Sequence, residues 1–390
     1  MNTILHSRPN GLHRDPLGLG LPDRLRHVLI VGKTGTGKST LLRAIAVSDL
    51  WRGNGLLLID PHGDLAAEVG AHIPRFRKND IVHFNATDPE SCPGLNPLRS
   101  VAPALRPLVV STILATIRKL FDAAFWGPRT EHVLRETLLA LTEVRGATLD
   151  DARMMLVDDA HRRWVLRQVT DAHVQAFWAR EFSRYNKAFG AEVTAPILNK
   201  LGALLASPPL RHIITKRRPV LDAERIMNSG RVVLASCPKG LVGEDATLLL
   251  GGLLLGAFQQ SALARANVAM AERVPFFLIV DEAGSFASRP LLELLAEGRK
   301  YGVGLILATQ SLAVLEDPVR AALLGNVGTM VSFRLGAEDA GLMESEFVHE
   351  FRASHLMRLA VGEMVVRIGV KRPVLIDSGN AALRPRLDHR

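Results

Sequence analysis

The segment from Gly32 to Ser39 has the spacing G-x-x-x-x-G-K-S, with an apolar run before it and a helical pattern after it. Glycines allow backbone N–H groups to surround phosphate oxygens, and the N-terminus of a helix adds positive potential. Lys38 can then reach the β- and γ-phosphates, and the Ser39 hydroxyl can ligate Mg²⁺. The pattern predicts a P-loop that binds a nucleoside triphosphate. The predicted nucleotide-binding residues are Gly32, Lys33, Thr34, Gly35, Thr36, Gly37, Lys38, Ser39 and Thr40.

Two adjacent carboxylates, Asp281 and Glu282, follow a second apolar run at residues 276–280. We expect Asp281 to complete the Mg²⁺ site together with Ser39. Glu282 is expected to polarise the attacking water and is the predicted catalytic base. Many strands end in acids, so this interpretation depends on the P-loop earlier in the chain.

An amide side chain, Gln310, follows a third apolar run at residues 303–309. Ligands bind at the carboxyl ends of parallel strands, which places this amide near the γ-phosphate or the attacking water. We predict that Gln310 is a catalytic residue that senses the nucleotide state. The alternative is a glutamine that only caps its loop.

A fourth junction, Asp60-Pro61-His62-Gly63-Asp64, ends the apolar run at residues 56–60. Asp60 and His62 are expected on the same rim as the P-loop. A metal site there lacks further ligands at suitable spacing. The alternative is that Asp60 and Asp64 orient the loop and cap the next helix.

Two arginines are candidates for contact with a γ-phosphate across a subunit boundary. Arg299 lies in the segment E-G-R-K-Y-G at residues 297–302, and Arg334 is the second candidate. A guanidinium in such a position stabilises the charge of the transferring phosphate. The alternative for Arg299 is a basic helix C-terminus that interacts with the helix dipole.

The runs that must position these residues are strand-like and almost entirely apolar, which is typical of a parallel sheet covered on both faces. They occur at residues 27–32, 56–60, 81–85, 231–237, 276–281, 303–309, 330–335, 363–370 and 373–376. Between about residues 99 and 220 only helical spacing appears, at 130–144, 154–169 and 196–205. The pattern predicts an α/β core interrupted by an all-α insertion.

Composition narrows the class of protein. The chain has 390 residues, 47% hydrophobic and 22% charged, as in a folded globular protein. Its two cysteines, Cys92 and Cys237, provide no disulfide framework, so a cytoplasmic location is expected. The apolar stretch at residues 246–258 is shorter than the ~20 residues of a membrane span and predicts a buried helix.

Residues 101–220 contain 18 Lys and Arg against 11 Asp and Glu, so they account for +7 of the net charge of +9. Such a surplus indicates either a polyanionic partner, such as nucleic acid, or a solvated helical surface. Trp126, Trp164 and Trp178 lie in the same segment. Tryptophans at such positions are more often core residues than base-stacking platforms.

Together these residues resemble the conjugative coupling ATPases of the TraG/TraD type, within the HerA/FtsK superfamily of ring-shaped DNA-pumping motors. The resemblance covers residues 25–377. It rests on the P-loop, D-P-H-G-D-L at 60–65, G-L-N-P-L at 94–98, V-D-E at 280–282, E-G-R-K-Y-G at 297–302, Gln310 and G-N-V-G-T at 325–329. Lys38, Ser39, Asp281, Glu282 and Gln310 match the motor positions of that family, and Arg299 matches a basic position that acts in trans.

The resemblance implies a RecA-like P-loop ATPase core with a mostly parallel central sheet, over residues 25–98 and 221–378. It also implies an all-α inserted domain over residues 99–220. We expect a loosely ordered segment over residues 1–24 and a basic tail over residues 379–390. The family works as a homo-hexamer that uses ATP and Mg²⁺ to move single- or double-stranded DNA through its pore.

Membrane-bound members carry an N-terminal transmembrane anchor, whereas this sequence reaches its P-loop almost at once. We therefore expect no transmembrane segment in it, and peripheral attachment to the inner membrane only through a relaxosome, secretion-channel or membrane-anchor partner. Two alternatives remain: a HerA-like DNA-end-processing or genome-packaging translocase, and a nucleotide-switched scaffold. Glu282 argues against the scaffold, because a pure switch can dispense with a catalytic carboxylate.

Overall fold

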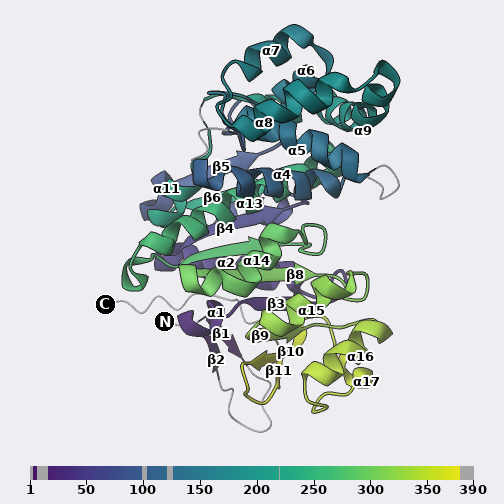
Figure 1. The fold of residues 1–390 in the computed structure, drawn as a ribbon. Helices are drawn as coiled ribbons and strands as arrows, with labels where there is room; N and C mark the ends of the chain where they lie inside the picture. Colours follow the sequence, from purple (N-terminus) through teal and green to yellow (C-terminus); the bar gives the residue numbers. More distant parts are fainter. Residues whose placement is uncertain (1–2, 7–15, 99–102, 121–125, 219, 378–390) are drawn as a thin grey trace, which may run out of the picture.

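The computed structural model describes residues 3–6, 16–98, 103–120, 126–218 and 220–377, and a nine-stranded sheet forms its centre (Figure 1). The strand order is β11-β10-β9-β3-β8-β7-β4-β6-β5. The strands are β3 (Val28–Val31), β4 (Gly55–Asp60), β5 (Ile81–Asn85), β6 (Val232–Ser236), β7 (Phe276–Val280), β8 (Val303–Thr309), β9 (Thr329–Ser332), β10 (Glu363–Ile368) and β11 (Val374–Asp377). Pairing is parallel from β9 to β5 and antiparallel only at β10 and β11. The predicted mostly parallel α/β sheet is confirmed.

Both faces of this sheet are covered by helices, as the unbroken apolar strands predict. Val28 and Ile30 pack into one core with α2 (Lys38–Arg52) and α3 (Asp64–Gly70). Leu29 and Val31 point to the opposite face and pack into the larger core. That core includes residues of α4 (Arg106–Arg118), α13 (Glu244–Ala264) and α14 (Arg289–Glu297). The period-two alternation along β3 thus assigns each side chain to one layer.

Helix α13 confirms the prediction of a buried apolar helix. Its segment Glu244–Asn267 is long and apolar enough to cross a membrane, but 78% of its most apolar window is buried inside the protein. A Cβ at Gly252 would lie 2.5 Å from Cγ2 of Thr116, and one at Gly256 would lie 2.3 Å from Cγ2 of Thr112. These glycines therefore let α4 and α13 approach closely.

Among the described residues between β5 and β6 the regular elements are helices, apart from an isolated bridge between Gly94 and Val220, and most of these helices lie together beyond the β5 end of the sheet (Figure 1). The helices there are α5 (Pro128–Thr142), α6 (Leu149–Val157), α7 (Asp159–Leu166), α8 (Ala172–Ala176), α9 (Lys187–Ala206) and α10 (Pro208–Thr215). Helix α4 precedes them but packs on α13 over the sheet. The insertion and the core therefore share one hydrophobic cluster, and the division at residues 99 and 220 stays a prediction.

Two helix predictions in this region were wrong at their limits. The single helix expected at 154–169 is two helices, because Asp158 has extended backbone angles and accepts from the N–H groups of Ala160 and His161 as the N-cap of α7. The helix expected at 196–205 begins at Lys187 and contains Pro196. Tertiary packing here outweighs the local cost of a proline inside the helix.

The described part of the N-terminal segment contains a pair of short strands and a short helix. β1 (Thr3–His6) pairs antiparallel with β2 (Pro16–Leu19), and the short helix α1 (Leu21–Arg24) follows. Leu19 is buried against the sheet. Composition gives no sign of this pairing, because it depends on backbone hydrogen bonds between distant residues. The predicted basic tail at 379–390 lies outside the described residues.

Candidate active site

Four loops that carry the predicted site residues meet at the carboxyl edge of the sheet. They follow β3, β8, β7 and β4, which are adjacent in that order and mutually parallel. The glutamine strand β8 therefore lies between the P-loop strand β3 and the acidic strand β7. This placement beside the acidic strand is what the sequence predicts for Gln310.

The P-loop connects β3 to α2 through two glycines with positive φ, 74° at Gly35 and 122° at Gly37. Only glycine adopts such angles readily. Nζ of Lys38 donates to the carbonyl oxygens of Gly32, at 2.6 Å, and Lys33, at 3.1 Å. Burial lowers the pKa of Lys38 below its ordinary value, while Glu282 and Asp281 act in the opposite direction. The ammonium group thus lies inside the loop that is expected to hold phosphate.

Asp281 is only 5% exposed and follows β7 directly. Burial, and then the neighbouring Glu282 and Asp60, raise the pKa of Asp281 above its ordinary value. A divalent cation would reverse that effect, because it favours the ionised carboxylate. Ser39 is exposed in the first turn of α2. A serine hydroxyl, an aspartate and phosphate oxygens are the hard oxygen ligands that Mg²⁺ prefers.

The loop after β4 is organised by Asp60 without any metal. Oδ1 of Asp60 accepts from the backbone N–H of His62, at 2.8 Å, and Oδ2 accepts from that of Ala66, at 2.9 Å. Within the described residues, no group of three or more His, Cys, Asp or Glu side chains could hold a metal ion. The two hydrogen bonds of Asp60 support the alternative in which it orients the loop and caps the first turn of α3, whereas Asp64 makes no side-chain cap bond there.

Glu282 lies at the centre of a polar network that joins all four loops. Its backbone has φ of 51°, an unusual value for a residue with a side chain. The Gln310 amide donates to Oε1 of Glu282, and Oε1 of Gln310 accepts from the Thr34 hydroxyl at 3.0 Å. Nε2 of His62 lies 4.0 Å from the same Glu282 oxygen. Gln310 thus connects the P-loop to the proposed base.

Asp339 is a residue of this site that the sequence reasoning missed. It is 5% exposed near the start of α16 (Ala337–Glu346). Its Oδ1 accepts from the N–H groups of Leu312 and Ala313, at 2.8 and 2.9 Å, so it holds the loop that follows Gln310. In the sequence, an aspartate three positions after a glycine looks only like part of an ordinary helix start.

The two candidate arginines lie at opposite edges of the sheet. Arg299 precedes β8 and is exposed at the amino edge, about 20 Å from the carboxyl edge given the length of β8. It therefore lies too far away to reach the nucleotide site of its own chain. Arg334 follows β9 at the carboxyl edge, and its carbonyl oxygen accepts from the P-loop N–H of Lys33 at 3.0 Å.

Part of this chain matches a family model described as helicase HerA, central domain. It matches residues 16–119, which include the P-loop. The Mycobacterium tuberculosis protein Rv2184c is 29% identical over 255 residues, 60% of this chain and 57% of that protein. The chain thus spans little more than half the length of this curated relative.

Solved structures match along nearly the whole chain. The bacterial conjugative coupling protein TrwB has a TM-score of 0.70 at 17% identity, covering 95% of this chain and 88% of that chain. VirB4 of Thermoanaerobacter pseudethanolicus has a TM-score of 0.64 at 16% identity, covering 96% and 95%. TrwB has also been solved with ADP and Mg²⁺, and with a non-hydrolysable ATP analogue. The chain thus has the fold of the coupling ATPases, and its residues 16–119, which include the P-loop, match the HerA central domain.

Proposed function

We propose that this chain is an ATP- and Mg²⁺-dependent motor that moves DNA, in the manner of the conjugative coupling ATPases. The observation that carries the proposal is the convergence of Lys38, Asp281, Glu282 and Gln310 at one sheet edge. Lys38 contacts phosphate, Ser39 and Asp281 hold Mg²⁺, and Glu282 takes a proton from the attacking water. Gln310, which donates to Glu282 in the structure, is proposed to sense the γ-phosphate.

DNA is the proposed cargo for two reasons. The segment at residues 101–220 concentrates the positive charge of the chain, and a concentrated basic surface attracts nucleic acid. The fold is also shared with plasmid coupling proteins. The test is the ATPase rate of the full chain with Mg²⁺, alone and with single- or double-stranded DNA, and with Lys38→Ala as the inactive control. Stimulation by DNA supports the motor. If neither single- nor double-stranded DNA changes the ATPase rate, the motor proposal is contradicted and the scaffold alternative is favoured.

The motor is proposed to work as a homo-hexamer, with Arg299 completing the site of the neighbouring subunit. Its place at the amino edge of its own sheet leaves it free for such a contact. Arg299→Ala subunits are expected to bind ATP and hydrolyse it poorly. Mixing them with Glu282→Gln subunits pairs an intact Arg299 with an intact Glu282 and restores part of the rate. If mixed rings form and restore nothing, Arg299 only stabilises its own chain and Arg334 becomes the candidate.

The chain is proposed to act in the cytoplasm, at the inner membrane where a relaxosome, secretion-channel or membrane-anchor partner recruits it. A HerA-like DNA-end-processing or genome-packaging role uses the same motor and remains the second candidate. Pull-down of the tagged chain with a relaxase would support conjugation, and pull-down with a nuclease would support end processing.

A further inference from the structure

The all-α region carries a surface groove that the nucleotide site does not explain. One hollow of about 540 Å³ lies between α5 and the segment from α8 to Tyr185. A second hollow of about 340 Å³ lies farther along α5, and His132 lines both. We call these two hollows together the basic groove. It is defined by Arg118, His132, Arg135, Arg180, Arg184 and Tyr185.

The groove is positively charged, because its lining contains four arginines and two glutamates. Arg118, Arg180 and Arg184 are exposed, and their side chains make no hydrogen bond or ion pair with the rest of the described residues. Arg135 differs, because it bonds Glu131 at 2.9 Å. Within the described part of the chain, these three guanidinium groups therefore have no hydrogen bond or ion pair that an anionic ligand would have to break, and Arg118 acts on Glu131 only at longer range.

Aromatic rings alternate with these charges. Phe177 is buried in the floor of the groove and meets the His132 ring edge to face, with ring centres 4.9 Å apart. The Tyr185 hydroxyl donates to Glu181 at 3.0 Å, and the indole N–H of Trp126 donates to Glu131 at 2.8 Å. These bonds fix rings that are half-buried in the groove wall. Fixed rings beside free guanidinium groups suit bases that are linked by phosphates.

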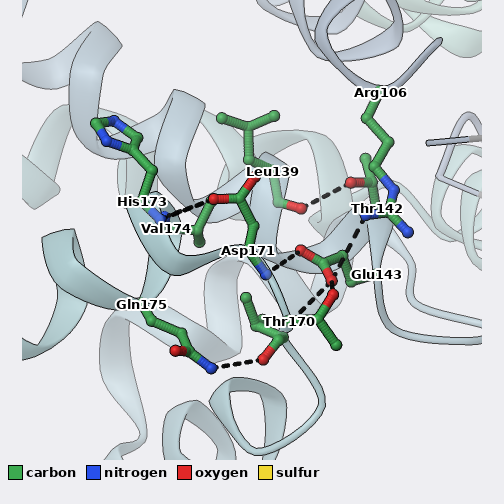
Figure 2. Close-up of polar contacts among 10 residues, drawn as sticks. Arg106, Leu139, Thr142, Glu143, Thr170, Asp171, His173, Val174 and Gln175 are labelled. Atoms are coloured by element: carbon green, nitrogen blue, oxygen red, sulfur yellow. Dashed lines mark hydrogen bonds and ion pairs between the residues drawn. The ribbon is translucent and has the colours of Figure 1, made fainter. Parts of the chain in front are cut away.

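The backbone of the groove is irregular and firmly held. Residues Phe177–Glu181 form a π-helix, a rare element that is frequent at functional sites. Figure 2 shows how the preceding helix α8 is anchored: Oδ1 of Asp171 caps it by accepting from the N–H of His173 at 2.8 Å. Glu143 in turn accepts from the N–H and hydroxyl of Thr170 and forms an ion pair with Arg106, at 3.5 Å, on α4. The groove wall is therefore tied to the helix that covers the sheet.

A buried acid, Glu136, lies close to His132 and His173, which line the groove. Glu136 is 3% exposed, and its Oε2 has no hydrogen-bond partner among the described residues. Burial raises the pKa of Glu136 above its ordinary value, although His132 and His173 act against this.

We propose that the basic groove binds single-stranded nucleic acid, with Arg118, Arg180 and Arg184 on phosphates and Tyr185 stacked on a base. This inference rests on the proposed function, because it names where the motor holds its DNA. Bases in a duplex already stack on one another and offer no free face, so the aromatic lining discriminates between the two forms. Arginines alone contact phosphates of both.

The chain supplies a matched control on α7. Arg163 and Arg167 are also separated by four residues, line a hollow of about 540 Å³ and lie in the same region, but Ala160 and Leu166 complete that lining. Replacing this pair removes the same charge without touching an aromatic ring of the basic groove. A purely electrostatic surface would respond equally to either pair.

The test measures fluorescence anisotropy of the full chain with labelled oligo(dT) of roughly 20 nucleotides, longer than common single-strand sites, and with a duplex of equal length. Replacing Arg180 and Arg184 together by Ala is expected to weaken oligo(dT) binding by about tenfold or more, and Tyr185→Ala by about fivefold or more. Duplex binding should change by less than about threefold, as should oligo(dT) binding after Arg163 and Arg167 are replaced. Unchanged melting temperature and basal ATPase rate confirm folding.

Three outcomes would contradict the proposal that the basic groove binds single-stranded nucleic acid. Equal loss from both arginine pairs shows a general electrostatic surface, and equal loss of duplex binding shows a backbone contact only. No loss from either groove variant leaves the hollow for another ligand, such as an acidic protein segment. If the unaltered chain binds neither form of DNA, the proposed function itself fails. If it binds DNA and the groove variants do so equally well, only this inference fails.

Discussion

The carboxyl and amino edges of the central sheet are both rich in charged side chains, but they use them differently. At the carboxyl edge, Glu282 has a strained backbone, and its carboxylate contacts another predicted site residue, Gln310. At the amino edge, Arg265 is 2% exposed and donates to Asn228 Oδ1 and to the carbonyl oxygens of Met227, Val274 and Tyr301. We propose that nucleotide exchanges the partners of the groups at the carboxyl edge, whereas the groups at the amino edge keep theirs.

This difference separates reactive from structural charges better than burial does. Lys38 and Asp281 are buried nearly as deeply as Arg265. They differ because a nucleotide and its Mg²⁺ would replace or complete their contacts, whereas nothing further is needed around Arg265. Arg24 and Asp49 repeat the amino-edge pattern, with their ion pair buried and Asn54 donating to Asp49 at 2.7 Å.

The largest effect on the ATPase rate is expected from Glu282, at the carboxyl edge of the sheet. Glu282→Gln should lower kcat by about 10³-fold while nucleotide still binds, since the amide accepts no proton from water. Lys38→Ala should lose nucleotide binding as well, because Lys38 contacts the phosphates. Steady-state ATPase rates and titration with a fluorescent ATP analogue measure both. Glu272→Gln, at an exposed amino-edge position, is the control. Normal turnover in Glu282→Gln would remove it from the catalytic role.

At the amino edge of the sheet, substitutions are expected to change the stability of the fold rather than the ATPase rate. Arg265→Met should lower the free energy of unfolding by about 3 kcal/mol, because it leaves several buried carbonyl groups without a donor. Urea unfolding measures the loss. The kcat of the folded fraction at low temperature should stay unchanged, since Arg265 lies far from the P-loop. A loss of kcat without a loss of stability would break the comparison between the two edges.

We expect the stability of the fold to depend on pH through His27, which lies at the amino edge of the sheet. Its Nδ1 accepts from the N–H of Leu305 at 3.0 Å, which requires the neutral ring. Burial, with Arg299 acting in the same direction, lowers the pKa of His27 to about 4. The unfolded chain binds a proton below pH 6.5 and the folded chain does not, so stability falls as the pH drops from 6.5 towards 4.

The expected loss is about 2 kcal/mol between pH 6.5 and pH 5, measured by urea unfolding at each pH. His27→Gln should remove most of this dependence. Arg299→Ala should reduce it, because a nearby positive charge is removed. If Arg299→Ala leaves the pH dependence unchanged, the arginine does not act on its own chain in this way, which would sharpen its assignment to the neighbouring subunit.

The sequence predicted which residues meet at the carboxyl edge, but it did not predict the contacts of the amino edge. Lys38, Asp281, Glu282 and Gln310 each follow a strand-like run, so parallel pairing alone brings them to one edge. The network of Arg265 depends on contacts between Asn228, Val274 and Tyr301, which no local pattern predicts. The same limit explains the missed β1–β2 pairing, the loop anchored by Asp339 and the two helices at 149–166, where an aspartate cap interrupts a continuous helical pattern.

The smallest effect on kcat is expected at His62, whose backbone is fixed like the residues of the amino edge but whose side chain lies beside Glu282. Its backbone is held permanently through Asp60, but its side chain is 42% exposed and lies 4.0 Å from the Glu282 oxygen that Gln310 also contacts. Besides Gln310, which is proposed to sense the nucleotide, His62 is the second side chain beside that oxygen. A hydrogen bond formed there during turnover would orient the carboxylate and contribute about 1 kcal/mol.

His62→Ala should therefore lower kcat by about fivefold, with KM for ATP unchanged, in steady-state assays. His62→Gln should retain more of the rate, because its amide nitrogen reaches a position close to Nε2. His83→Ala, at an exposed position on β5, is the control and should have no effect. A raised KM with an unchanged kcat would mean that His62 contacts the nucleotide rather than Glu282. The loop after β4 would then belong to substrate binding, and the network around Glu282 would end at Gln310.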